Sequence, residues 1–418
     1  MQKKLNRYKK ITQCRLCNSR KIKQIYNFGL IPLGNDLQKY SLASINCHKY
    51  PLSLMQCSKC SHFQLAISVN PKILFAKNYT YLTGITKTFK DHFKKYSKWI
   101  IKKCKLKKNS LIIDIGSNDG TCLSYFKKNN MRVLGIDPAK LPASLANKKK
   151  INTINKFFNT TTSNFILSKY GQVDFVTSHN VLAHTENIKE VFLSIFKILK
   201  KNGYFCFEIG YFRNVVRKNL FDTIYHEHLD YHHAKPLINF LEKIGFSIMD
   251  ISTNNIQGGT LRILTQKKEF VVQRKNKIKS FLKNEKSFFM KSKIKYKFQE
   301  FEKSISNLNK FVNKFKINHT NIFAYGSPTK ASLLLISSRL NIRVIKNSFE
   351  DNHLKCKKYI PGTDIKIINS NLIKKKNPSL VIILAWNFAK EIILKLKSKK
   401  IKGIKIITPL PKLKINII

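Results

Sequence analysis

The chain has 418 residues, more than one hydrophobic core usually supports, so we expect two or three domains. Hydrophobic residues make up 43% of it, which excludes a wholly disordered chain. No apolar run approaches the roughly 18 residues of a membrane span, and no secretory signal follows the basic start MQKKLNRYKK, so we expect a cytoplasmic protein.

The formal net charge of +57 raises the question of a nucleic-acid partner. Ten of the 79 basic residues are arginine and 69 are lysine, and the lysines occur in scattered runs such as KKCKLKK and NLIKKKN, without interleaved aromatic residues. Lys, Asn, Ile, Phe and Tyr share A/T-rich codons, so genome bias explains much of the excess. The composition favours a solvated lysine surface over a nucleic-acid groove, although this charge should still attract anionic ligands.

The hydrophobic pattern predicts an α/β protein. Residues 11–70 combine turns with short strands, with FGLIPLGN as a loop, and residues 79–105 have the apolar spacing of a helix. Strands (LIIDIGS, RVLGID, VDFVTSHN, YFCFEIG) then alternate with helices (TCLSYFKKNN, IKEVFLSIFKILK), which predicts a parallel, helix-covered sheet. After a charged, helix-prone stretch at 270–315, a second α/β rhythm has strands at IFAYGS, IRVIKNSFED, SLVIILAW and IKIITPLP, with helices at 330–339 and 387–397.

Four of the nine cysteines form two Cys-x-x-Cys pairs, CRLC with Cys14 and Cys17, and CSKC with Cys57 and Cys60. Each pair lets two thiolates face one ion, and two pairs give the tetrahedral Cys₄ sphere that zinc favours. We expect a closed, structural zinc site that holds a small domain together. The alternative is a chance pairing of buried or redox cysteines.

A glycine loop follows the first strand of the sheet. The glycines let the backbone approach a ligand at the start of a helix, but the spacing does not fit the G-x-G-x-x-G of dinucleotide-binding folds. The next strand ends in an acid that can accept hydrogen bonds from two ribose hydroxyls. Together these features favour S-adenosylmethionine (SAM) over an ordinary strand–helix corner. The expected cofactor-binding residues here are Asp114, Gly116, Asn118, Asp119, Gly120 and Asp137.

With these motifs in place, the chain resembles the zinc-containing, SAM-dependent sugar C-methyltransferases, which act on nucleotide-linked keto-deoxysugars. The resemblance covers nearly the full chain. Besides the cysteine pairs it includes NYTY at Asn78–Tyr81, DIGSNDGT at Asp114–Thr121, HNVLAH at His179–His184, FEIGYF at Phe207–Phe212, YHEH at Tyr225–His228, NNIQGGTLRI at Asn254–Ile263, AYGSPTK at Ala324–Lys330, EDN at Glu350–Asn352, PGT at Pro361–Thr363 and LAWNFAKEI at Leu384–Ile392.

The resemblance implies a division of the chain into four parts. We expect a zinc-binding module at 1–75, a class I SAM-methyltransferase domain with a Rossmann-like sheet at 76–270, a helical connector at 271–315, and a C-terminal Rossmann-like substrate-binding domain at 316–418. The loop AYGSPTK of the last part is a candidate diphosphate contact, through backbone amides and Lys330, or an ordinary strand–helix corner.

The resemblance also implies catalytic residues. His228 corresponds to the base that removes a proton from the sugar carbon, with Glu227 and Tyr225 beside it, and His184 and Tyr79 complete the set. We expect a neighbouring carboxylate, Glu227 or another acid, to raise the basicity of His228 and fix its tautomer. The tyrosines and His184 would stabilise the developing oxyanion or hold the sugar. We also expect Asn180, in HNVLAH, to contact the cofactor.

The segment YHEHLDYHH holds four of the 11 histidines, so a second metal site and a polar histidine face remain alternatives to a catalytic base. The expected function is C-methylation of a nucleotide-linked, dTDP-type keto-deoxysugar. The alternatives are a methyltransferase of RNA or another small molecule, and a non-catalytic, zinc-anchored binding protein. The sequence does not predict the oligomeric state.

Overall fold

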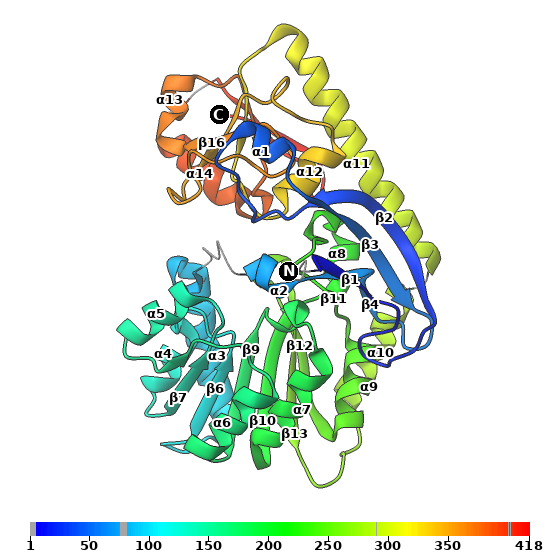
Figure 1. Cartoon of the computed structure of the whole chain (residues 1–418), viewed down its shortest axis with the longest axis vertical. Coiled ribbons are helices and arrows are strands. Elements are labelled where there is room, and N and C mark those ends of the chain that lie inside the picture. Colours follow the sequence, from blue (N-terminus) through cyan, green and yellow to red (C-terminus); the bar gives the residue numbers. More distant parts are fainter. Residues whose placement is uncertain (1–5, 76–81, 290, 400, 402) are drawn as a thin grey trace, which may run out of the picture.

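The computed structural model describes residues 6–75, 82–289, 291–399, 401 and 403–418, so the predicted catalytic Tyr79 lies outside the described residues. Two α/β parts lie one above the other, and strands β2 and β3 together with the long helix α11 run along one side of both (Figure 1). The N-terminal strands therefore touch both halves of the molecule.

The middle of the chain forms a seven-stranded sheet with the order β12-β13-β10-β9-β6-β7-β8, in which only β13 runs antiparallel to its neighbours. Separate hydrophobic clusters cover its two faces, one built with α3 and α4 and the other with α6, α7 and α9. This confirms the predicted class I methyltransferase fold. The strands are β6 Leu111–Ile115, β7 Arg132–Ile136, β8 Thr153–Ile154, β9 Val173–His179, β10 Leu199–Gly210, β12 Phe246–Asn254 and β13 Thr260–Lys267.

The three helices predicted in this part form α3, α4 and α7, because their apolar residues recur at helical spacing. Phe89, Phe93, Tyr96 and Ile100 form the buried face of α3. The helices are α3 Lys87–Lys103, α4 Thr121–Lys127, α5 Lys140–Lys148, α6 Thr160–Tyr170, α7 Ile188–Ile198, α8 Phe212–Arg217 and α9 Ala234–Ile244, with short 3₁₀ helices η1 Thr83–Ile85, η2 Leu182–His184, η3 Phe221–Thr223 and η4 Ile256–Gly258.

The N-terminal module is built on an antiparallel sheet with the order β11-β4-β3-β2, and its edge strand β11 comes from the segment that follows YHEH. A second, two-stranded sheet pairs β1 with β5. The elements are β1 Tyr8–Lys10, β2 Ile22–Pro32, α1 Ser41–Ile45, β3 Lys49–Cys57, β4 Phe63–Leu65, β5 Ile67–Val69, α2 Pro71–Phe75 and β11 Asp230–Tyr231. The module therefore includes residues from two distant parts of the chain.

One prediction for this module is wrong. FGLIPLGN was expected to form a loop, but residues 28–32 continue strand β2. The pairing with β3 is irregular between Asn27 and Leu30, and Gly29 in that gap has a φ of +81°. A bulge therefore absorbs the glycine, and the strand resumes with Ile31 buried in the core.

The C-terminal part has a six-stranded sheet with the order β16-β15-β14-β17-β18-β19, parallel except for the last strand, as in Rossmann-like folds. Helices α10 and α11 form the predicted helical connection. The elements are α10 Asn276–Lys286, η5 Ser287–Phe289, α11 Lys291–Asn318, β14 Ile322–Tyr325, α12 Ala331–Ser337, β15 Asn347–Glu350, β16 Lys366–Asn369, η6 Ser370–Leu372, α13 Ile373–Lys376, β17 Leu380–Ile383, η7 Trp386–Phe388, α14 Ala389–Ser398, β18 Lys405–Thr408 and β19 Lys414–Ile417.

The strand predicted over IRVIKNSFED is shorter than expected. Only its second half forms β15, because Val344 and Ile345 sit in a turn whose amides donate to the carbonyl of Asn341. Both side chains are nevertheless buried, so they contribute apolar residues to the core without joining the sheet.

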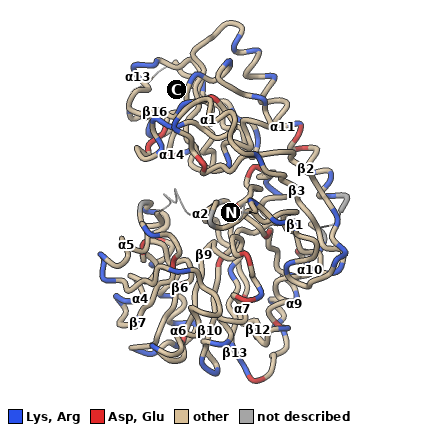
Figure 2. Tube along the Cα trace, in the orientation of Figure 1, with Lys and Arg blue, Asp and Glu red and all other residues tan. Residues whose placement is uncertain are grey.

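Lysine and arginine positions are spread over all parts of the molecule (Figure 2). This distribution agrees with the predicted solvated lysine surface. Within the described ranges, no helix is long and apolar enough to cross a membrane.

Candidate active site

The four predicted zinc ligands come together at one end of the N-terminal module. The sulfur atoms of Cys14 and Cys60 lie 3.5 Å apart, those of Cys17 and Cys57 lie 3.6 Å apart, and all four lie within 4.8 Å of one another. A tetrahedral Cys₄ zinc site with Zn–S bonds of about 2.3 Å requires sulfur separations of about 3.8 Å. The donor set and its spacing therefore fit zinc.

The two Cys-x-x-Cys pairs have the same backbone turn. Asn18 donates its amide to the carbonyl of Cys14, Ser61 donates to that of Cys57, and both residues have positive φ, 58° and 69°. The left-handed residue reverses the chain immediately after the pair, so that both sulfurs of a pair face the same point. The same local geometry is thus built twice.

A buried ion pair connects the zinc module to the YHEH segment. Arg15, between the first two cysteines, contacts both carboxylate oxygens of Asp230 at 3.0 Å, and Nε2 of His62 lies 2.8 Å from one of them. Burial raises the pKa of Asp230, but Arg15 and His62 outweigh it and lower this pKa to about 2. Since Asp230 also lies in β11, the zinc module fixes the chain two residues after His228.

The glycine loop lies at the carboxyl ends of β6 and β7, where ligands bind in open α/β sheets. Gly116 has a φ of +73°, and a Cβ there would come within 2.1 Å of Val181. Asn118 and Gly120 also have positive φ. Each oxygen of Asp137 accepts a backbone N–H at 2.8 Å, from Asn118 and from Ala139. The loop is therefore closely packed and held by the predicted ribose-binding acid.

Two of the predicted cofactor acids differ in their surroundings. Asp114 is 2% exposed, and burial, followed by the nearby Asp137, raises its pKa well above the usual range. Its Oδ1 has no hydrogen-bond partner in the described part of the chain. Asp119 instead accepts from Thr83 and Thr121 and pairs with Lys149. A buried polar atom with no partner next to the loop fits a site for a polar cofactor such as SAM.

Asn180, the third part of the predicted cofactor site, follows β9 and has a φ of +56°. Its backbone N–H donates to the carbonyl of Glu208 at 2.7 Å, and the next residue, Val181, packs on Gly116. The structure thus brings Asn180 to the same sheet edge as the glycine loop.

The structure also brings together the predicted catalytic residues that it describes. Nε2 of His228 lies 3.0 Å from the hydroxyl of Tyr225, and the rings of His228 and His184 are 4.8 Å apart. Nδ1 of His228 lies 3.1 Å from the carbonyl of Thr223. A carbonyl only accepts, so Nδ1 carries the proton, and the lone pair on Nε2 accepts from Tyr225. This is the tautomer that a base acting through Nε2 requires.

The proposed partnership between His228 and a carboxylate is wrong for this structure. Oε1 of Glu227 accepts from the side-chain amide of Asn35 at 2.6 Å, and the tautomer of His228 is set by Thr223 instead. Burial raises the pKa of Glu227 to about 7. Nδ1 of His184 donates to the carbonyl of Glu227 at 2.7 Å, so Glu227 orients His184 through its backbone.

Burial also determines the charge of the two histidines. It lowers the pKa of His228 to about 3, with a further effect of His184, and that of His184 to about 4. Both imidazoles are therefore neutral at neutral pH. A proton taken up by His228 is stable only if a negative charge forms next to it in the same step.

Sequence reasoning missed Asn35 and its contact with Thr329 in the loop after β14. The side chain of Asn35 donates to Glu227 and accepts from Thr329, so it joins the N-terminal module, the YHEH segment and the C-terminal part. A Cβ on Gly34 would lie 1.8 Å from the carbonyl oxygen of Thr329. No local pattern marks these contacts, because the partners lie far apart in the sequence.

The predicted diphosphate contact in AYGSPTK is not supported. The amide of Ser327 donates to Glu350 at 2.8 Å, and Lys330 is 9% exposed with its ammonium 3.6 Å from Asp222 and 3.1 Å from the ring centre of Trp386. Protein groups therefore already satisfy the amide and the ammonium that would bind a phosphate.

Two of the other histidines of YHEHLDYHH, His226 and His233, hold the segment in place. His226 contacts the carbonyl of Pro51, and His233 contacts that of Ser61 and the carboxylate of Glu285. Among the described residues, metal-ligating side chains come together at the cysteines and at a second group, but none of the YHEHLDYHH histidines belongs to either. The second group is His92, His179 and Glu208.

That second group has no need of a metal. Glu208 accepts from His92 at 2.7 Å and His179 at 3.1 Å through one oxygen, and from Asn254 and Arg262 through the other. The carboxylate is saturated and Arg262 neutralises it. Hydrogen bonding alone accounts for this arrangement.

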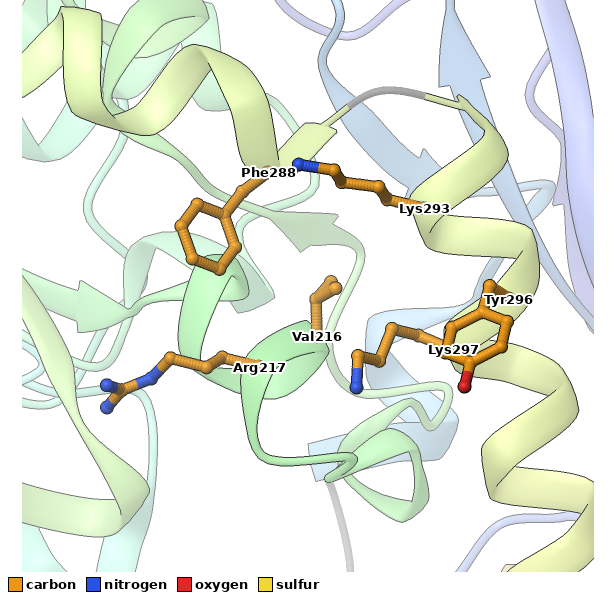
Figure 3. Close-up of a pocket in the computed structure, with 6 residues that line it drawn as sticks. All are labelled: Val216, Arg217, Phe288, Lys293, Tyr296 and Lys297. Atoms are coloured by element: carbon orange, nitrogen blue, oxygen red, sulfur yellow. The ribbon is translucent and has the colours of Figure 1, made fainter.

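A cavity of about 410 Å³ lies between α8 and the start of α11. In Figure 3, Lys293 and Lys297 extend from α11 on either side of Val216, and Arg217 extends away from them. No predicted site residue lines it; the lining residues are Val216, Arg217, Phe288, Lys293, Tyr296 and Lys297.

Comparisons with known proteins cover nearly the whole chain. A zinc binding domain family matches residues 14–75, a methyltransferase domain family residues 89–251, and the C-methyltransferase C-terminal domain family residues 255–411. The C-methyltransferase NovU of Streptomyces niveus is 27% identical over 405 residues, which are 96% of this chain and 96% of NovU.

The solved structures that match this chain cover less than half of it. The magnesium protoporphyrin IX methyltransferase of Synechocystis PCC 6803, with bound SAM, is 14% identical with a TM-score of 0.32, over 43% of this chain and 79% of its own. A SAM-dependent methyltransferase of Clostridium acetobutylicum ATCC 824 is also 14% identical, with a TM-score of 0.34, over 42% of this chain and 92% of its own. The fold assignment rests on the strand order and the family matches.

Proposed function

We propose that this chain, which belongs to the zinc-containing, SAM-dependent C-methyltransferases, methylates a ring carbon of a nucleotide-linked keto-deoxysugar. The observation that carries the proposal is the arrangement of His228, with its proton held on Nδ1 by Thr223 and Nε2 directed at Tyr225. The ordered motifs shared with the sugar C-methyltransferases support the substrate class, and we propose a dTDP-linked sugar on the same ground.

A carbon beside a ketone loses a proton only if a base is in reach and the enolate oxygen is stabilised. His228 would take that proton on Nε2, and the electron pair left on carbon would form the new bond to the methyl group. SAM, when bound, supplies that methyl group on a sulfonium. Tyr225 lies close enough to His228 to donate to the enolate oxygen, whereas neutral His184, whose one N–H donates to the carbonyl of Glu227, would help to hold the sugar.

The neutral, buried state of His228 suits this step. Its low pKa keeps Nε2 unprotonated at neutral pH, and the enolate charge that forms beside it offsets the cost of a buried imidazolium. The proposed cofactor residues are Asp114, Gly116, Asn118, Asp119, Gly120, Asp137 and Asn180, and the proposed zinc ligands are Cys14, Cys17, Cys57 and Cys60. We propose Tyr79 as an additional catalytic residue from the motif alone.

The test uses methyl-labelled SAM with a panel of dTDP-4-keto-6-deoxysugars, and bulk RNA as the competing acceptor. We expect label in one or more sugars and none in RNA. His228→Asn should abolish transfer, whereas His319→Asn, which changes an exposed histidine, should leave it unchanged. Label in RNA alone, or normal turnover by His228→Asn, contradicts the proposal.

A further inference from the structure

A contact between the C-terminal part and η3 lies next to His228 and has no role in the reaction described above. Asp222, in the middle of η3, is 0% exposed. Its Oδ2 accepts from the indole Nε1 of Trp386 at 2.5 Å and lies 3.6 Å from the ammonium of Lys330. Both partners belong to the C-terminal part, more than one hundred residues further along the chain.

Burying this charged contact costs free energy, so a contribution to stability alone does not explain it. The second oxygen, Oδ1, is buried and has no hydrogen-bond partner in the described ranges, and burial raises the pKa of Asp222. A well-packed apolar residue often replaces a buried ion pair without loss of stability. An unsatisfied carboxylate oxygen therefore calls for an explanation beyond packing.

The neighbouring residue supplies that explanation. Thr223, the last residue of η3, provides the carbonyl that accepts from Nδ1 of His228. The turn is closed by bonds from Thr223 to Leu220, and Phe221 stacks on Phe298 of α11 with ring centres 4.0 Å apart. Asp222 is thus the point at which the C-terminal part holds the turn that fixes the tautomer of His228.

We propose that Asp222 and Trp386 are positioning residues, whose hydrogen bond across the two parts of the molecule keeps the Thr223 carbonyl on Nδ1 of His228. The inference rests on the proposed function for the importance of that tautomer. In a neutral histidine, a ring nitrogen that faces a carbonyl carries the proton, because the carbonyl can only accept, and the other nitrogen is then left with its lone pair. Without this contact, His228 would divide between its two tautomers.

The tautomer is measurable without substrate. The full-length, zinc-loaded protein is labelled with ¹⁵N-histidine, and the His228 signals are identified by their absence in His228→Asn. We expect the wild type to show His228 with Nδ1 protonated and Nε2 unprotonated. Trp386→Phe, which removes the indole donor, and Asp222→Ala, which removes the acceptor, should both give a mixture of tautomers.

Two further variants separate positioning from a general loss of structure. Asp222→Asn keeps an oxygen that accepts from the indole, so it should retain the wild-type tautomer. Trp99→Phe, at the only other tryptophan, should also retain it. The double variant Asp222→Ala, Trp386→Phe should shift the tautomer no further than Asp222→Ala alone, because Asp222→Ala already removes the bond to the indole.

Activity provides the second measurement. In Trp386→Phe we expect kcat for an accepted sugar to fall at least about tenfold, with an unchanged Kd for SAM, because a displaced base loses alignment. A wild-type tautomer in both Trp386→Phe and Asp222→Ala overturns the proposal, as does loss of the tautomer in Asp222→Asn. If no sugar in the panel is methylated but the tautomer shifts as expected, the positioning role stands and the substrate proposal fails.

Discussion

Replacing Arg15 with methionine tests how strongly the zinc module is tied to the YHEH segment. The change removes the cation from a fully buried Asp230 and leaves His62 as its remaining partner. Breaking a buried pair by removing one member typically costs about 3–5 kcal/mol. The shift of the Asp230 pKa from 3.8 to about 2 corresponds to about 2 kcal/mol. Because His62 remains, we expect a loss of about 3 kcal/mol.

The loss is measured by urea unfolding at pH 7, followed by circular dichroism and fluorescence. Lys9→Met is the matched control, because the Lys9–Glu186 pair is exposed, 63% and 40% for the two side chains, and should contribute less than about 1 kcal/mol. A loss below about 1 kcal/mol in Arg15→Met, or one equal to that of the control, would refute the coupling.

The same ion pair predicts that the stability of the folded protein depends on pH in the acid range. The pKa of Asp230 is lower in the folded than in the unfolded state, so its stabilisation is present above about pH 4 and is lost as the pH falls towards 2. Arg15→Met should show a smaller loss of stability over this range than the wild type.

The remaining predictions concern the zinc site, the cofactor and Glu227. Chelating zinc, or Cys57→Ser, should unfold the N-terminal module, and metal analysis should find one zinc per chain; purified protein without zinc would contradict this. Asp137→Ala should raise the Kd for SAM about 10- to 100-fold in calorimetry, through loss of charge-assisted hydrogen bonds to the ribose; an unchanged Kd would exclude this contact. Since burial raises the pKa of Glu227 from 4.5 to about 7, the free energy of unfolding should fall by about 3 kcal/mol as the pH rises between these values. Glu227→Gln should lack this fall, and equal pH profiles for the two proteins would contradict the shift.

The parts of the site that sequence analysis located are those built by local chain geometry. Cys14 and Cys17 share a turn, and the loop from Asp114 to Gly120 joins a strand to the next helix, so short-range spacing is enough to recognise them. The alternating strands and helices likewise predicted both sheets. These features depend on residues close together in the sequence.

The sequence could not locate the residues that join distant segments. Asn35 meets Glu227 across 192 positions, and Asp222 meets Trp386 across 164. Neither Asn35 nor Asp222 belongs to a spacing pattern. The partner of His228 was assigned to a neighbouring carboxylate for a different reason: Thr223 is only five positions away, but it acts through its backbone carbonyl, which every residue has and no residue pattern marks.

The loop prediction for FGLIPLGN failed for a different reason. Gly29 and Pro32 suggest a chain reversal when only local preferences are considered. In the folded protein β3 offers a full-length partner, and the bulge at Gly29 lets the strand continue past the glycine. Tertiary pairing overrides the local preference here.

Solvent exchange at the sugar carbon tests directly whether His228 is the base. A sugar that the enzyme methylates is incubated in D₂O with S-adenosylhomocysteine in place of SAM, and deuterium is measured by mass spectrometry and NMR. We expect the wild type to introduce deuterium at the carbon beside the ketone and His228→Asn to introduce none. Equal exchange by His228→Asn would contradict the assignment of His228 as the base.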